Sequence, residues 1–211
     1  MLIFDFFSGT GSSTKAFEDN GCTVISFELE PSFEATHTID MFDVTSEWLI
    51  ERYGHPHFIW ASPPCTAFSV ASIGHHWSKE DGVFIPKTDA AVRNQKLVLH
   101  VRKIIEELKP TYGYLIENPM GVLRKLPAVE GLKRNSITYC AYGDSRMKPT
   151  DLWGEVTNWQ PRMPCKRGES CHISAPRGSQ TGTQGIKGAK DRSRVPYELG
   201  LEIFEAIRLK Y

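Results

Sequence analysis

Short runs of apolar residues alternate with segments of helical periodicity along most of the chain. Each run is bounded by glycine, proline or polar residues, which is typical of strands buried inside a sheet. Apolar residues recur at helical spacing from Leu97 to Leu108 and predict a helix over residues 93–108. The predicted strands are residues 2–7, 22–27, 58–61, 112–116, 136–140 and 148–153, and a last helix begins within residues 195–200. This pattern predicts one α/β domain, with a central, mostly parallel sheet flanked by helices.

Reactive side chains follow several of the predicted strands. The run 58–61 leads into Pro63 and Pro64, which stop a strand and fix the next turn, and Cys65 follows directly. Open α/β sheets bind ligands at the carboxyl ends of their strands, so Cys65 is a candidate nucleophile. A cysteine in this place can equally be packed as a small hydrophobic residue. Glu117 follows another predicted strand and supplies a second polar group at the same edge.

A glycine-rich turn follows the first predicted strand. Residues 8–14 include Gly9 and Gly11 and lead into a helical segment. This arrangement is typical of nucleotide or nucleoside sites, because glycines let a ligand approach the backbone and a helix N-terminus presents free amides. Glu28 ends the second strand about 20 residues later, where a carboxylate suits ribose hydroxyls. Residues 38–44 are a candidate third strand.

Composition predicts an ordinary globular protein of a reducing compartment. The 211 residues include 25 Lys and Arg and 25 Asp and Glu, so the net charge gives no indication of a nucleic-acid partner. Residues 162–194 are nevertheless locally basic. We expect no secretory signal, because the N-terminus has no basic start and no cleavage site, and no membrane span, because no apolar run reaches about 20 residues. Five cysteines without a regular framework suit a reducing interior. We therefore expect a cytoplasmic location.

Two long segments show no clear period. Residues 72–89 predict a loop near the substrate, and residues 154–193 are rich in Gly, Pro and basic residues and predict no regular structure. The second segment holds three potential zinc ligands, one fewer than a closed structural site needs. We predict an ordinary reduced loop and no metal. The three residues are Cys165, Cys171 and His172, with Cys140 as a candidate fourth whose proximity the sequence does not show.

Five stretches, in order, resemble motifs of the DNA (cytosine-5) methyltransferase family and cover most of the chain. DFFSGTG (residues 5–11) resembles the motif that binds S-adenosylmethionine, and PCTAFS (64–69) resembles the Pro-Cys-Gln-x-Phe-Ser motif that carries the nucleophile. ENP (117–119) resembles the Glu-Asn-Val motif. YGDSRMK (142–148) resembles the basic motif near the target base, and VPYELG (195–200) the motif that completes the cofactor pocket. The resemblance implies a Rossmann-like methyltransferase fold.

The resemblance also implies a role for each matching residue. Cys65 is expected to add to carbon 6 of cytosine, because carbon 5 is a poor nucleophile until a group has added to carbon 6. Cysteine suits this addition, since it is highly nucleophilic near neutral pH. Glu117 is expected to share a proton with ring nitrogen 3, and Arg146 to stabilise charge near the carbonyl oxygen. The implied cofactor is S-adenosylmethionine. The implied cofactor-binding residues are Phe7, Ser8, Gly9, Thr10, Gly11, Glu28, Asp43, Val44 and Pro64, and the substrate-binding residues are Ser69, Asn118, Lys148 and Arg177.

The chain departs from the family pattern in two places. Pro119 stands where valine is usual, and residues 154–193 are short where the family has a larger target-recognition domain. We therefore predict a minimal member, with a catalytic core over residues 1–153, a short basic insertion over 154–193 and a closing helix over 194–211. A short basic segment binds phosphates but reads little sequence.

The predicted function is methyl transfer to carbon 5 of a flipped cytosine in DNA. A catalytically silent nucleic-acid-binding protein, and the same chemistry on RNA or a free cytosine nucleotide, are the alternatives. The sequence leaves the oligomeric state and any specificity-giving partner open.

Overall fold

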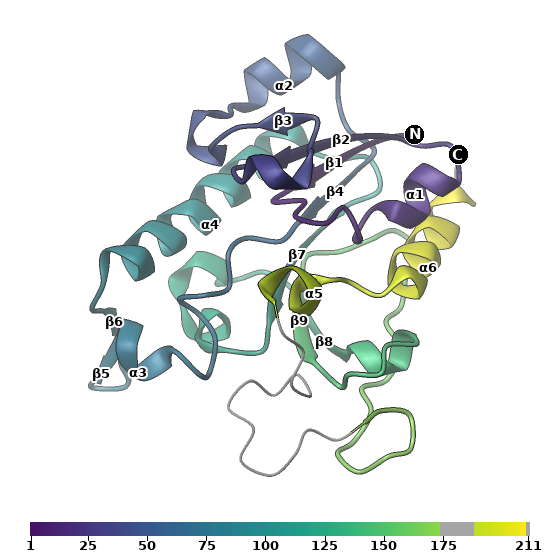
Figure 1. Ribbon diagram of the computed structural model, residues 1–211. Coiled ribbons are helices and arrows are strands. Elements are labelled where there is room, and N and C mark those ends of the chain that lie inside the picture. Colours follow the sequence, from purple (N-terminus) through teal and green to yellow (C-terminus); the bar gives the residue numbers. More distant parts are fainter. Residues whose placement is uncertain (174–187, 210–211) are drawn as a thin grey trace.

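A seven-stranded sheet forms the centre of the protein in the computed structural model, which describes residues 1–173 and 188–209 (Figure 1). Its strands are β1 (Leu2–Phe6), β2 (Thr23–Glu28), β3 (His37–Thr38), β4 (Phe58–Ala61), β7 (Tyr114–Pro119), β8 (Arg134–Thr138) and β9 (Pro149–Trp153). They lie in the order β3-β2-β1-β4-β7-β9-β8. The first five run parallel, and β9 is antiparallel to both its neighbours. The predicted α/β architecture with a mostly parallel sheet is confirmed.

Helices cover both faces of the sheet. α1 (Lys15–Asp19) and α6 (Tyr197–Arg208) lie on one side, and α2 (Ser46–Tyr53) and α4 (Asp89–Leu108) lie on the other (Figure 1). Successive side chains of a strand point to opposite faces, so Ile3 packs in the cluster that includes α1 and α6, while Phe4 packs in the cluster with α2 and α4. Each face therefore buries its own apolar core.

The loops after the parallel strands meet at one edge of the sheet, which we call the carboxyl edge. The register pairs Phe6 of β1 with Phe27 of β2 and with Ala61 of β4, so these strands end almost level. Ala61 in turn pairs with Ile116 of β7. Side chains at the ends of four different strands are thereby brought to the same edge.

The hairpin of β8 and β9 confirms the predicted pair of late strands and changes the position of Glu117. β7 continues three residues past its predicted end, because Glu117 and Asn118 pair with Leu152 and Asp151 of β9. Glu117 therefore lies inside a strand rather than in the loop after it. α4 likewise begins before residue 93, since the Thr88 hydroxyl accepts a hydrogen bond from the Ala91 amide and caps the helix.

The prediction of a structureless loop over residues 72–89 is wrong. The segment contains α3 (Ile73–His76) and a hairpin of β5 (Trp77–Glu80) and β6 (Val83–Pro86). Asp81 and Gly82 form its turn with φ of 48° and 87°, the conformation that an Asp-Gly pair favours between two strands. The buried Trp77 anchors the hairpin, because its Nε1 donates to the Ala67 carbonyl at 2.6 Å.

Other predicted elements are shorter or differently placed. The candidate third strand over residues 38–44 is reduced to β3, followed by the short 3-10 helix η2 (Met41–Asp43). Residues 157–173 contain no helix or strand, whereas α5 (Ala189–Ser193) forms a helix where no regular structure was predicted. Within the part of the chain that the structure describes, no helix has the length and apolarity required to cross a membrane.

Candidate active site

The glycine turn after β1 is a tight loop with three residues at positive φ. Phe7, Gly9 and Gly11 have φ of 61°, 49° and 67°. The Ser8 amide donates to the Phe27 carbonyl of β2 at 3.0 Å, and the Gly11 amide donates to the Ser8 carbonyl at 2.8 Å. The loop is therefore tied to the neighbouring strand and turned upon itself.

The Glu28 carboxylate lies against this loop. Its Oε2 accepts the Gly9 amide at 2.9 Å, and its Oε1 accepts the Leu29 and Glu30 amides at 2.8 and 3.2 Å. A carboxylate offers about four acceptor positions, so one remains for a ligand hydroxyl. No atom of the described residues lies within 4 Å of a Cβ built on Gly9 or Gly11, which leaves open space beside the loop. These features fit the ribose end of a nucleoside cofactor.

The buried carboxyl of Asp5 binds the end of the glycine loop. Asp5 is fully buried in β1, and its Oδ2 accepts hydrogen bonds from Ser13 Oγ at 2.9 Å and Thr14 Oγ1 at 2.7 Å. Burial raises the pKa of Asp5 to about 7, against the two hydrogen bonds that lower it. The sequence motif assigns Asp5 no separate role, although a charged residue that interrupts an apolar strand indicates one.

The C-terminal motif closes over the same loop. The Val195 amide donates to Ser12 Oγ at 2.9 Å across 183 residues of sequence. Gly200 of α6 packs so closely that a Cβ there would lie 2.9 Å from the Ser13 carbonyl oxygen. The structure thus brings residues 195–200 to the glycine loop, as the resemblance implied.

The other predicted cofactor residues differ in exposure. Asp43 ends η2 and is exposed, whereas the Val44 side chain is fully buried in the core. The Val44 carbonyl accepts a hydrogen bond from His100 Nε2 at 3.1 Å. Of this pair, Asp43 alone presents its side chain at the surface.

The turn that carries Cys65 is held by two buried amides. Asn118 Nδ2 donates to the Pro63 carbonyl at 2.9 Å, and Asn94 Nδ2 donates to the Pro64 carbonyl at 3.3 Å. The Cys65 carbonyl accepts the Phe68 and Ser69 amides at 2.9 and 3.0 Å. Cys65 is therefore half-buried at a fixed place on the carboxyl edge.

Glu117 lies beside this turn, in the neighbouring strand β7. Its carboxyl is buried, and Oε1 accepts a hydrogen bond from the Tyr139 hydroxyl at 2.9 Å. Lys148 Nζ lies 4.3 Å from the centre of the Tyr139 ring. Our sequence analysis assigned no role to Tyr139, because it lay within a predicted strand and its contact depends on how two strands pack.

Burial and neighbouring charges shift the pKa values of Cys65, Glu117 and Lys148. Burial raises the pKa of the Cys65 thiol, the neighbouring Glu117 carboxyl raises it further, and the Lys148 ammonium opposes both. Burial likewise raises the pKa of Glu117, against Lys148 and the hydrogen bond from Tyr139. Burial lowers the pKa of Lys148. Burial therefore disfavours the charged form of each of these three groups.

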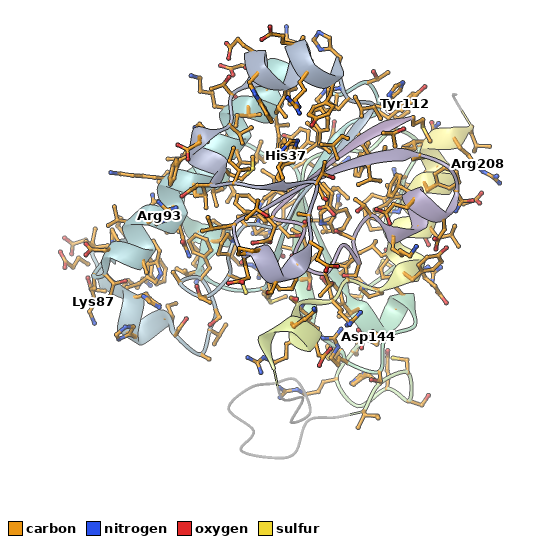
Figure 2. The ribbon with its side chains drawn as sticks, turned by 45° about the horizontal axis from the view of Figure 1, so that its top comes forward. His37, Lys87, Arg93, Tyr112, Asp144 and Arg208 are labelled. Carbon is orange, nitrogen blue, oxygen red and sulfur yellow. The ribbon has the colours of Figure 1, made fainter. Side chains whose placement is uncertain are left out.

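Arg146 makes its contacts within the chain, and its expected role toward the substrate carbonyl oxygen stays a prediction. It is 4% exposed, and its guanidinium pairs with Asp144, which lies beside α5 (Figure 2). Its remaining hydrogen bonds go to the carbonyls of Asp191, Arg192 and Arg194, at 3.1 to 3.2 Å. The described contacts make Arg146 a clamp between the basic motif and the segment around α5, while Lys148 is the cation that acts on Glu117 and Cys65.

Three of the four predicted substrate residues, Ser69, Asn118 and Lys148, interact with Cys65 or with the turn that carries it. Ser69 is half-buried beside the Cys65 turn and forms an isolated bridge with Gly121. Asn118 is fully buried and holds Pro63, and in the part of the chain described here its Oδ1 has no hydrogen-bond partner. Arg177 lies outside the described residues.

The chain is similar to cytosine methyltransferases in sequence. The family model described as "C-5 cytosine-specific DNA methylase" matches residues 1–127, more than half of the chain. The chain belongs to this family. A curated relative from Frog virus 3 (isolate Goorha), named "Probable DNA (cytosine-5)-methyltransferase", is 28% identical over 225 residues, which cover 97% of this chain and 99% of the relative. The family predicted from the motifs is confirmed, and S-adenosylmethionine is the methyl donor that this family uses.

Solved structures confirm the Rossmann-like methyltransferase fold. The Entamoeba histolytica methyltransferase EhMeth matches with a TM-score of 0.54 at 15% identity, and the S. pombe Dnmt2 methyltransferase matches with 0.52 at 12% identity. The matches cover 79% and 77% of this chain but 57% and 53% of those chains. The chain therefore spans little more than half the length of these solved proteins.

Proposed function

We propose that this protein transfers a methyl group from S-adenosylmethionine to carbon 5 of cytosine in DNA, through a covalent adduct between Cys65 and carbon 6. The observation that carries the proposal is the pairing of Cys65 and Glu117. The two residues come from the ends of the adjacent parallel strands β4 and β7, and they interact electrostatically at the carboxyl edge. A nucleophile beside a carboxylic acid is what addition to the cytosine ring requires.

Glu117 suits the part of the general acid. Burial raises the pKa of Glu117, which favours the protonated form that a general acid needs, and the hydrogen bond from Tyr139 orients the carboxyl. Addition of sulfur to carbon 6 pushes electrons toward ring nitrogen 3, so a proton delivered there by Glu117 stabilises the adduct. After methyl transfer, ring nitrogen 3 returns its proton to Glu117, a water molecule takes the proton of carbon 5, and Cys65 leaves by elimination as the thiolate.

Cys65 must lose its proton before it can attack. Burial opposes the thiolate, and the positive charges of Lys148 and, to a smaller extent, Arg192 favour it. A thiol that ionises only when a site is assembled is protected from unwanted oxidation. Asn118 and Asn94 contribute by holding the carbonyls of Pro63 and Pro64, which aims the side chain that follows.

The cofactor supplies a positively charged sulfonium whose methyl group accepts the electrons of carbon 5. We propose that residues 7–11 hold it together with Glu28 toward ribose and Asp43 toward adenine. The open space beside Gly9 and Gly11 and the unused acceptor position of Glu28 support this assignment.

DNA is the proposed substrate because the matching family is defined by DNA methylation. The base must leave a duplex stack to reach Cys65. We propose that residues 1–153 form the catalytic core, that 154–193 contact phosphates in place of a recognition domain, and that 194–211 complete the cofactor site. All five cysteines are free, which supports the proposed cytoplasmic location.

A parallel assay tests the proposal. The protein is incubated with labelled S-adenosylmethionine and with duplex DNA, RNA or dCMP, and label at cytosine carbon 5 is measured. We expect label in DNA, and a stable adduct with DNA that contains 5-fluorocytosine. Label in RNA or dCMP alone would replace DNA as the substrate. No label and no adduct in any substrate would favour a silent binding protein.

A further inference from the structure

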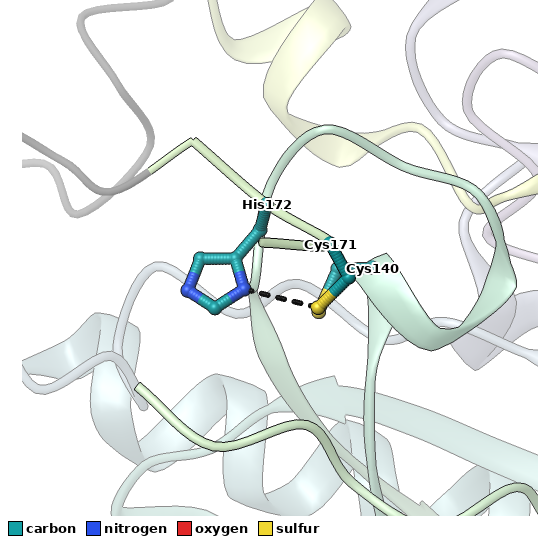
Figure 3. Close-up of side chains that lie close together, drawn as sticks. All are labelled: Cys140, Cys171 and His172. Carbon is teal, nitrogen blue, oxygen red and sulfur yellow. Dashed lines mark hydrogen bonds between the residues drawn. The ribbon is translucent and has the colours of Figure 1, made fainter. Parts of the chain in front are cut away.

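Three cysteines and a histidine outside the active site come together in the structure. Cys140 belongs to the 3-10 helix η5 (Tyr139–Tyr142), whereas the other three residues belong to the segment after β9. The ligand atoms of Cys140, Cys171 and His172 lie within 4.8 Å of one another (Figure 3). Cys171 Sγ lies 3.3 Å from His172 Nδ1. Residues that the sequence separates by about thirty positions thus face a common point.

Cys165 completes the group. Cys165 Sγ and Cys171 Sγ lie within 4.8 Å of each other, so Cys171 belongs both to this pair and to the group with Cys140 and His172. We propose that Cys140, Cys165, Cys171 and His172 bind one structural zinc ion. Ligands at about 2.0–2.3 Å from a tetrahedral zinc lie about 3.5–4 Å apart, so the observed cluster closes around an ion with small side-chain movements.

The donor set favours zinc over other metals and over simple packing. Thiolate and imidazole ligands in a three-to-one ratio form a common closed zinc site, whereas hard cations prefer oxygen. Cys171 is exposed and Cys165 is half-buried, so packing as small hydrophobic residues does not account for them. Glu169 also lies within 4.8 Å of Cys165 and Cys171, but a closed four-ligand site does not need its carboxylate.

The surrounding backbone shows what the ion does. Residues 157–173 have no helix or strand to stabilise them, and their ties to the core include bonds from the Cys165 amide to Thr138 Oγ1 and from the Ile173 amide to the Ser145 carbonyl, both 2.9 Å. A metal shared with Cys140 fixes this segment to the core. Cys140 directly follows Tyr139, which supports Glu117, so the anchor lies next to the active site.

Metal analysis of the full chain, expressed without a histidine tag and purified under reducing conditions, tests the site. We expect about one zinc ion per chain. Cys171→Ser is expected to lose most of the zinc, whereas Cys22→Ser and Glu169→Gln retain it. His172→Cys supplies a fourth thiolate and is expected to retain the ion too. Wild-type protein that stays free of zinc after incubation with the ion, or Cys171→Ser with wild-type zinc content, would overturn the proposal.

Cobalt substitution of the wild-type protein covers the case in which Cys171→Ser does not fold. We expect the intense visible absorption of tetrahedral cobalt with thiolate ligands. A weak octahedral spectrum, or a disulfide between two of these cysteines in protein kept reduced during purification, would contradict the site. Both measurements are independent of methyl transfer, so failure of the proposed catalytic function would leave them unchanged.

Discussion

The turn that carries Cys65 and the segment over residues 157–173 are held in different ways. Buried amides fix the turn from two sides, and the sheet beneath it is fully packed. The segment is anchored near its start by the buried Trp159, and the rest of it depends on contacts near the surface, among them the ion pairs of Arg162 with Glu198 and Glu202 of α6. Buried, satisfied contacts resist local opening, and exposed ones resist it little. The contacts among the described residues therefore hold the Cys65 turn more firmly than the neighbouring segment, which the proposed zinc ion would fix further.

Removing the nucleophile is expected to have the largest effect. Cys65→Ala should abolish methyl transfer and the 5-fluorocytosine adduct, while leaving the free energy of unfolding almost unchanged, because the turn depends on backbone carbonyls rather than on the thiol. Label transfer and thermal unfolding measure the two quantities. Cys22→Ala is the control, and transfer by Cys65→Ala at the wild-type rate would exclude the covalent route.

Removing the acid is expected to slow the reaction without stopping it. Glu117→Gln keeps the shape of the side chain and should reduce the rate by about 10²–10⁴. Because the neutral acid is the proposed active form of Glu117, the alkaline side of the wild-type pH profile should show a fall in rate that Glu117→Gln lacks, whereas ionisation of Cys65 makes the rate rise on the acid side. Pre-steady-state transfer between pH 6 and 9 measures both. The exposed Glu130→Gln is the control, and an unchanged rate in Glu117→Gln would remove this residue from the mechanism.

The support under the glycine loop predicts a pH effect on stability. Because the pKa of Asp5 is raised from 3.8 to about 7, the folded state holds this proton longer than the unfolded state. The contribution of this proton to stability is complete below about pH 4 and is lost as pH rises to about 7. The free energy of unfolding should fall by up to about 4 kcal/mol over this range. The free energy of unfolding, measured with urea at several pH values, should depend less on pH in Asp5→Asn than in wild type or Asp81→Asn. Equal slopes in all three would contradict the assignment.

The weakly held region is expected to give the smallest effect. Arg162→Ala removes exposed ion pairs with Glu198 and Glu202 and a hydrogen bond to the Ala141 carbonyl. Such contacts contribute little in water, so the free energy of unfolding should fall by about 1 kcal/mol or less. Proteolysis within residues 157–173 should nevertheless become faster. A loss of several kcal/mol would show that the segment is as firmly built into the core as the Cys65 turn.

The sequence predicted the positions of the active-site residues better than their contacts. In the sequence, a buried strand ends where an apolar run stops. Cys65, Glu28 and the glycine loop each lie at or after such an end, so their position at one edge of the sheet could be predicted. The Tyr139 contact to Glu117 and the Arg146 clamp could not follow, because they join segments whose packing depends on the whole sheet. The approach of Cys140 to Cys171 was hidden for the same reason.

The hairpin over residues 77–86 was missed for a different reason. Its strands are short and half-exposed, so their apolar pattern is weak, and the only strong local signal was Asp81-Gly82. The Trp77 anchor that stabilises the hairpin is a tertiary contact with Ala67. Local propensity and long-range packing were both needed here.

The hydrogen bond between Val195 and Ser12 has a consequence for how the protein is made. It joins parts of the chain that leave the ribosome 183 residues apart. β1 and its glycine loop are synthesised first, but residues 195–200, which pack against the loop, are synthesised only near the end of the chain. Such distant contacts form late in folding, so the nascent chain can build its sheet before it can hold a cofactor. Binding of the methyl donor should therefore report that synthesis has passed the last helix.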